Sequence, residues 1–152
     1  MITTINEFKN NIFFHGSTKL FENNFILTPQ IDGYVNNTSE KELEDLFEKY
    51  KPTNKLSRFN SVFLCDKIED IESAGGYIDF IYSIKPIGIS EKSDLAWYTE
   101  VQLLLDNHKN TDKSILTAIN NYWNGNIFYN KENSLFEYRT PNAQIIELIE
   151  EN

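Results

Sequence analysis

Residues 13–17 read Phe-Phe-His-Gly-Ser, and residues 136–144 read Phe-Glu-Tyr-Arg-Thr-Pro-Asn-Ala-Gln. Both stretches are rich in the aromatic and apolar residues that favour buried strands. The first ends in a His-Gly-Ser sequence, whereas the second carries Glu137 as its only acidic residue. Taken in this order, the two stretches predict a site that joins an early strand to a late strand.

The size and composition of the chain are those of a small globular domain. It has 152 residues, of which 40% are hydrophobic and 24% charged, so we expect a single domain over residues 1–152. A domain of this length can bury roughly 68–70% of its unfolded surface, which requires neither a metal nor a disulfide. Aromatic residues make up 14% of the chain and indicate a large aromatic core or a lined cleft.

The charge and the few cysteines exclude several classes of protein. The net charge of −9 disfavours non-specific binding to a nucleic-acid backbone. Cys65 is the only cysteine, so no intramolecular disulfide can form, and its apolar neighbours predict a small buried side chain. Two histidines and one cysteine make a dedicated metal site improbable. With no signal-like N-terminus and no apolar segment of ~20 residues, we expect a cytoplasmic protein that does not span a membrane.

Hydrophobic periodicity predicts a mixture of strands and helices. We expect strands over 12–15, 25–27, 61–65, 77–84, 127–129, 135–138 and 143–148, with Pro86 ending the fourth of them. We expect helices over 39–50, 66–74, 93–107 and 111–123, with Ser39 as the N-cap of the first. Because these elements do not alternate regularly as βαβ units, they predict an α+β fold.

Candidate ligand-binding residues follow the first predicted strand. Gly16 allows a ligand to approach the backbone, where its N–H and C=O can bind an amide. His15 and Ser17 can each hydrogen-bond a hydroxyl group. The alternative is an ordinary turn at the end of a strand, containing a hydrogen-bonded histidine.

Three further candidates lie downstream. Glu137 sits among apolar and aromatic residues, an environment common at acid–base sites; the alternative is an outward-facing residue paired with Arg139. Phe63 can stack on a planar ring or belong to an ordinary core strand. Arg58 has the geometry to bind a pyrophosphate, or it is a solvated loop residue.

Together, these blocks resemble the ADP-ribosyltransferase superfamily, on its His-Tyr-Glu branch, which includes diphtheria-toxin-like enzymes and poly(ADP-ribose) polymerases. The similar blocks are residues 14–17, 27–29, 62–66 followed by 73–74, and 137–144, which span most of the chain in the family's order. The resemblance implies two small packed β-sheets with flanking helices around an NAD cleft.

The resemblance also implies roles for individual residues. His15 corresponds to the histidine that binds the nicotinamide ribose, and Gly16 to the glycine whose backbone binds the carboxamide. Glu137 corresponds to the catalytic glutamate. Phe63 stands where the family has tyrosine, which keeps ring stacking but removes the hydroxyl, and Tyr77 is our candidate for the second stacking ring.

The sequence therefore predicts a mono-ADP-ribosyltransferase with NAD as co-substrate and a macromolecular acceptor, which we expect to be a protein. Leu135 stands where arginine-modifying relatives carry an acid or an amide, which disfavours an arginine acceptor. The compact chain is similar to small phage or bacterial effectors and toxins of the superfamily, including anti-CRISPR transferases. Two alternatives stay open: a catalytically inactive binding or decoy domain of the same fold, and an NAD-dependent RNA 2′-phosphotransferase, which the negative charge disfavours. The sequence predicts no oligomeric state.

Overall fold

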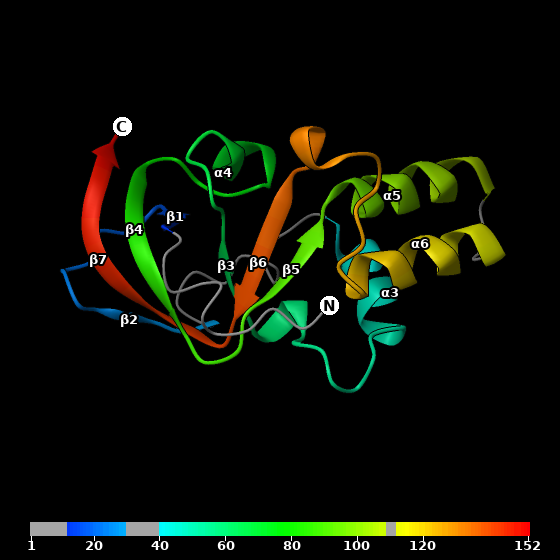
Figure 1. Ribbon diagram of the computed structural model, residues 1–152, viewed down its shortest axis with the longest axis horizontal. Coiled ribbons are helices and arrows are strands. Elements are labelled where there is room, and N and C mark those ends of the chain that lie inside the picture. The colour runs from blue at the N-terminus through cyan, green and yellow to red at the C-terminus, as the bar shows by residue number, and fades with distance from the viewer. Residues whose placement is uncertain (1–11, 30–39, 109–111) are drawn as a thin grey trace.

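The molecule contains two antiparallel sheets, the four-stranded one at one end and the three-stranded one between it and a group of three helices at the other end (Figure 1). The computed structural model describes residues 12–29, 40–108 and 112–152. A curled four-stranded sheet has the order β1-β4-β7-β2, and a three-stranded sheet has the order β3-β6-β5 (Figure 1). The strands are β1 (Phe13–Ser17), β2 (Ile26–Leu27), β3 (Val62–Leu64), β4 (Phe80–Ile87), β5 (Glu91–Asp94), β6 (Phe136–Thr140) and β7 (Asn142–Glu151). The predicted α+β fold with two small sheets and flanking helices is confirmed.

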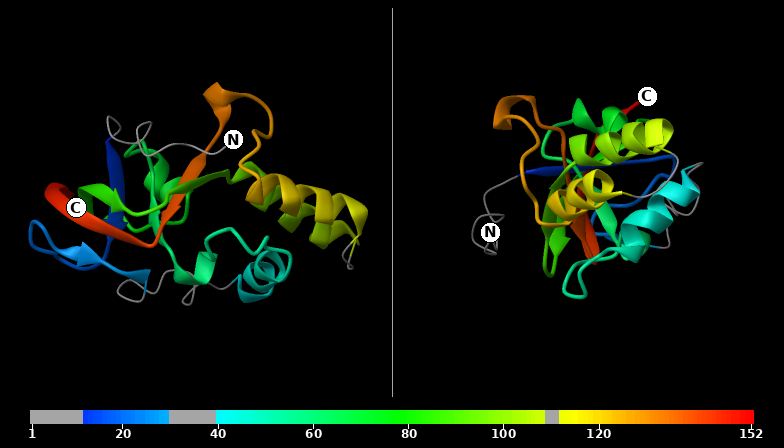
Figure 2. Two further views of the ribbon diagram at one scale, coloured as in Figure 1. Left: turned by 60° about the horizontal axis from the view of Figure 1, so that its bottom comes forward. Right: turned by 90° about the vertical axis from the view of Figure 1, so that its right-hand side faces the viewer.

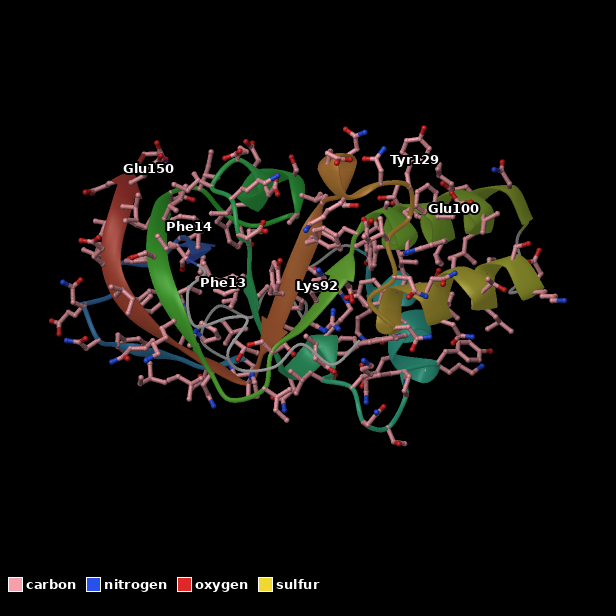
Figure 3. The ribbon with its side chains drawn as sticks, viewed as in Figure 1. Phe13, Phe14, Lys92, Glu100, Tyr129 and Glu150 are labelled. Carbon is pink, nitrogen blue, oxygen red and sulfur yellow. The ribbon has the colours of Figure 1, made fainter. Side chains whose placement is uncertain are left out.

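The main hydrophobic core lies between the two sheets. Phe13 of β1 points into this space (Figure 3), where its ring meets that of Tyr138 edge-on, with 4.9 Å between the ring centroids. The other buried members come from both sheets: Leu27, Val62, Leu64, Tyr82, Ile84, Phe136, Ala143 and Ile145. Their alternation along the strands gives each sheet one face in this core.

Three helices form a second core at one end of the molecule (Figures 1 and 2). They are α3 (Lys41–Lys49), α5 (Ala96–His108) and α6 (Lys113–Trp123). Trp123 is buried there and donates its indole N–H to the carbonyl oxygen of Phe47 at 3.0 Å. None of the helices in the described parts of the chain is long and apolar enough to cross a bilayer.

The two sheets meet edge to edge at β1 and β3. The backbones of Phe14 and Cys65 exchange hydrogen bonds of 2.8 and 2.9 Å. The short helix α4 (Asp70–Ser73) covers this junction with Ile71, which packs with Cys65 and Ile81 in a third small cluster. The contact is important for the site because it sets β1 beside β3.

Several predicted elements need correction. The helix predicted over 66–74 is the short α4, and the strand predicted over 77–84 begins only at Phe80. Glu91–Asp94 was predicted outside any strand and partly as the start of a helix, but it forms β5 because it pairs with β6. Strand β4 continues through Pro86 to Ile87; beyond Ile84 it pairs with β7 alone, so the missing proline N–H faces an open edge. Residues 127–129 form no strand. The predicted N-cap Ser39 lies outside the described residues.

Candidate functional site

A pocket opens where the edge of β1 meets the edge of β3. Its lining comes from β1, the segment after β2, the 3₁₀ helix η2 (Arg58–Asn60), β3, α4 with the loop after it, and β6. The lining residues are Phe14, His15, Gly16, Leu27, Thr28, Pro29, Arg58, Phe59, Ser61, Val62, Phe63, Leu64, Cys65, Ile71, Ala74, Gly76, Tyr77 and Glu137. The structure thus brings six of the seven predicted site residues to one pocket, all except Ser17.

His15 is oriented by the neighbouring strand. Its Nδ1 lies 2.7 Å from the carbonyl oxygen of Phe63. A carbonyl oxygen can only accept, so Nδ1 carries the hydrogen, and Nε2 is the acceptor nitrogen of the neutral ring. The hydrogen bond therefore fixes both the tautomer and the plane of the ring at the pocket.

The backbone of Gly16 faces the pocket side of β1. Phe14 bonds Cys65 through both its N–H and its C=O, so its peptide groups point away from β4. Because backbone groups alternate along a strand, those of Gly16 point the same way as those of Phe14. A Cβ at Gly16 would overlap the carbonyl oxygen of Tyr77, so only glycine fits. The position offers one donor and one acceptor to a ligand.

Two of the pocket's aromatic side chains are the predicted stacking residues. Phe63 is half-buried and lies beneath the guanidinium of Arg58, with 5.0 Å between Arg58 Cζ and the ring centroid. Tyr77 is 41% exposed and comes from the loop after α4, and its backbone carbonyl lies against Gly16. Both residues line the pocket, Phe63 from β3 and Tyr77 from the loop after α4, so each is in a place where an aromatic ring can contact a flat ligand.

Glu137 is the pocket's buried carboxylate, at 2% exposure. Its Oε1 accepts hydrogen bonds from Arg58 Nη1 and from the Tyr122 hydroxyl, and lies 3.6 Å from Arg139 Nη1. Oε2 accepts no hydrogen bond from the described residues. It is also not one of their buried polar atoms without a partner, so it is accessible, and it faces the pocket that Glu137 lines. The alternative predicted for Glu137 is correct in its pairing with Arg139 but wrong in its direction, since the side chain is buried rather than outward-facing.

Arg58 is a buried partner of Glu137 and not a solvated loop residue. Its side chain is 3% exposed, and Glu44 on α3 binds it at both Nε (2.7 Å) and Nη2 (3.0 Å). Burial lowers the pKa of Arg58, but the negative charges of Glu137 and Glu44 outweigh this and raise it well above its ordinary value. Because these partners occupy most of its N–H groups, we replace the predicted pyrophosphate contact with a role in positioning Glu137. The solvated-loop alternative is wrong.

Tyr122 and Arg139 were not predicted as site residues. The Tyr122 hydroxyl accepts hydrogen bonds from Arg58 Nη1 at 2.6 Å and from Arg139 Nη1 at 2.9 Å. Burial raises the pKa of Tyr122 above its ordinary value; the two arginines oppose this, and Glu137 adds to it. The phenol therefore stays protonated. The sequence placed Tyr122 only within the helix predicted over 111–123, and nothing local signalled its contact with β6.

Two other side chains have structural roles. Ser17 is fully buried, lies outside the pocket lining, and accepts the backbone N–H of Lys19 at 3.1 Å, so we withdraw its predicted ligand contact. Cys65 lines the pocket, but burial, followed by the charge of Glu137, raises its pKa to about 12. A thiol with so high a pKa is not a nucleophile at neutral pH.

No protein-family model matches this chain, and neither does any curated protein sequence. The resemblance to ADP-ribosyltransferases therefore rests on the sequence motifs alone.

Proposed function

We propose that this protein is a mono-ADP-ribosyltransferase that cleaves NAD at the nicotinamide glycosidic bond. The observation that carries the proposal is the convergence of His15, Gly16, Phe63, Tyr77 and Glu137 on one pocket. The family resemblance assigns these positions to nicotinamide binding, ribose binding and catalysis. Four separate segments of the chain supply them, so their meeting is not a consequence of sequence proximity.

The proposed binding mode follows from the donors and acceptors at the pocket. A carboxamide has one acceptor oxygen and a donor NH₂, which match the N–H and C=O of Gly16. In the tautomer that carries its hydrogen on Nδ1, His15 can accept a hydrogen bond from a ribose hydroxyl at Nε2. Phe63 and Tyr77 provide ring faces for the planar nicotinamide.

Glu137 acts on the charge that develops during cleavage. As the bond from ribose C1′ to the nicotinamide nitrogen breaks, its electron pair leaves with nicotinamide and the ribose becomes positively charged. The Oε2 oxygen of Glu137 accepts a hydrogen bond from the ribose 2′-hydroxyl and stabilises that positive charge, as carboxylates do in glycoside cleavage. The acceptor's nucleophilic atom then bonds to C1′ and loses its proton, which Glu137 is suited to take.

We propose a protein as the acceptor. The chain's net charge of −9 favours encounter with a basic partner and opposes binding to nucleic acid. Cytoplasmic action as a small effector or toxin is part of the same proposal, because NAD and protein acceptors occur together there.

The test is nicotinamide release from NAD by the purified chain, with and without cell lysate. We expect Glu137→Gln to lower the rate by about 10²-fold or more. The matched control is Glu147→Gln, which makes the same change at an exposed position of β7. Circular dichroism of both variants excludes unfolding as the cause, and mass spectrometry of the lysate identifies the acceptor.

Each contrary result has a definite meaning. Full activity of a folded Glu137→Gln variant would exclude the catalytic role. A wild-type chain that binds NAD without releasing nicotinamide would be a binding or decoy domain of the same fold. If the wild-type chain neither binds NAD nor releases nicotinamide, NAD is excluded as its substrate.

A further inference from the structure

A buried tyrosine outside the pocket lining makes a direct contact with the proposed catalytic carboxylate. Tyr122 lies near the C-terminal end of α6 and is completely buried. Its ring packs edge-on against Phe47 and Trp123, with centroid distances of 4.9 and 5.0 Å. The ring is fully buried among these neighbours, and its hydroxyl reaches Glu137 of β6.

The direction of the hydrogen bond between Tyr122 and Glu137 is determined by the arginines. A phenol has one hydrogen and lone pairs that accept. Arg58 and Arg139 both donate to the Tyr122 oxygen, and a guanidinium can only donate. The phenolic hydrogen is therefore directed to Oε1 of Glu137, the remaining partner of the hydroxyl.

Anchoring Oε1 in this way sets the plane of the carboxylate. The terminal torsion of a glutamate is otherwise broad. Two donors bind Oε1 directly, whereas Oε2 is left toward the pocket. Reactions that depend on one oriented oxygen are sensitive to displacements of about 1 Å.

We infer that Tyr122 is a positioning residue of the proposed reaction, which fixes Glu137 so that Oε2 alone meets the ribose. Tyr122 does not line the pocket and touches no substrate, so it acts only through Glu137. Arg139 supports it from β6, where Nη1 also donates to Ser93 Oγ at 2.8 Å. This inference rests on the proposed function.

The test is Tyr122→Phe, which keeps the ring and removes the hydroxyl. Hydrogen bonds to charged groups contribute enough that we expect kcat for nicotinamide release to fall about 10–100-fold. NAD affinity should stay close to that of the wild type, because the pocket lining is unchanged. A structural defect would instead lower both quantities.

Tyr98→Phe is the matched control. The Tyr98 ring stacks on Phe47 at 4.9 Å and lies 5.0 Å from Arg58 Cζ, and its hydroxyl donates to Glu44 at 2.9 Å. Tyr98 therefore belongs to the same core but contacts Glu44 and Arg58 rather than Glu137, and Glu44 keeps both of its hydrogen bonds to Arg58 when the Tyr98 hydroxyl is removed. We expect Tyr98→Phe to keep nearly the wild-type kcat. Equal losses in the two variants would overturn the inference while leaving the proposed function intact.

A thermodynamic cycle tests the contact without NAD. If Tyr122 donates to Glu137, the effects of Tyr122→Phe and Glu137→Gln on the unfolding equilibrium constant should be non-additive by about 10-fold or more. Additive effects would overturn the inference.

Arg139→Lys provides a second variant with the charge kept, and we expect a smaller fall in kcat at unchanged NAD affinity. A wild-type chain that releases no nicotinamide would instead defeat the proposed function, and this role of Tyr122 with it.

Discussion

Glu44→Gln tests the buried charge cluster without altering the pocket lining. Glu44 is 3% exposed and binds Arg58 through two hydrogen bonds, of 2.7 and 3.0 Å. The cluster contains two carboxylates, Glu44 and Glu137, and two guanidinium groups, Arg58 and Arg139, so its formal charge is zero. The substitution leaves one uncompensated positive charge.

The expected cost follows from this burial. Breaking a buried ion pair on one side costs about 3–5 kcal/mol, and the screening that weakens exposed pairs does not apply here. For a domain of this size, that cost lowers the melting temperature by about 6–20 °C. We would measure the free energy of unfolding in urea by tryptophan fluorescence, because Trp123 is buried beside the cluster.

Asp45→Asn is the control for this measurement. Asp45 is the next acidic residue of α3, and its ion pair with Lys41 at 2.6 Å is exposed. We expect this substitution to change the free energy of unfolding by no more than about 1 kcal/mol. If Glu44→Gln costs no more than the control, the reasoning about a closed, charge-balanced cluster is refuted.

Three further residues give outcomes that can be checked. Gly16→Ala places a methyl group on the Tyr77 carbonyl oxygen, so we expect NAD affinity to fall about 10-fold or more by calorimetry, and unchanged affinity would contradict the close approach. Burial raises the pKa of Cys65 from 9.0 to about 12, so a thiol reagent at pH 8 should modify the folded chain about 10³-fold more slowly than the unfolded chain. The free energy of unfolding should also decrease as the pH rises from 9 to 12, because only the unfolded thiol ionises in that range. Asp94→Ala removes the acceptor for two backbone N–H groups and one hydroxyl, so urea unfolding should show a loss of at least about 2 kcal/mol; a smaller loss would mean that water replaces the carboxylate.

Elements with a strong local signal could be predicted from the sequence. The aromatic and apolar residues of Phe13–Ser17 and Phe136–Thr140 indicated β1 and β6 because such side chains pack well on a sheet. Strand β5 had no such signal, since Glu91–Asp94 is entirely polar. It becomes a strand through pairing with β6 and through the bond from Ser93 Oγ to the carbonyl oxygen of Tyr122 at 2.8 Å.

The sequence by itself determined which residue types were available for chemistry, and where. A histidine and a glycine follow an early apolar run, and an acid lies within a late one; these are local properties that a single strand displays. Only the tertiary structure decided how the acid is held. Arg58 and Glu137 are 79 positions apart, and Arg58 and Tyr122 are 64 apart, so no short-range pattern joins them. Their contact follows from the packing of the helices on the three-stranded sheet, where buried charges must find partners because water is excluded.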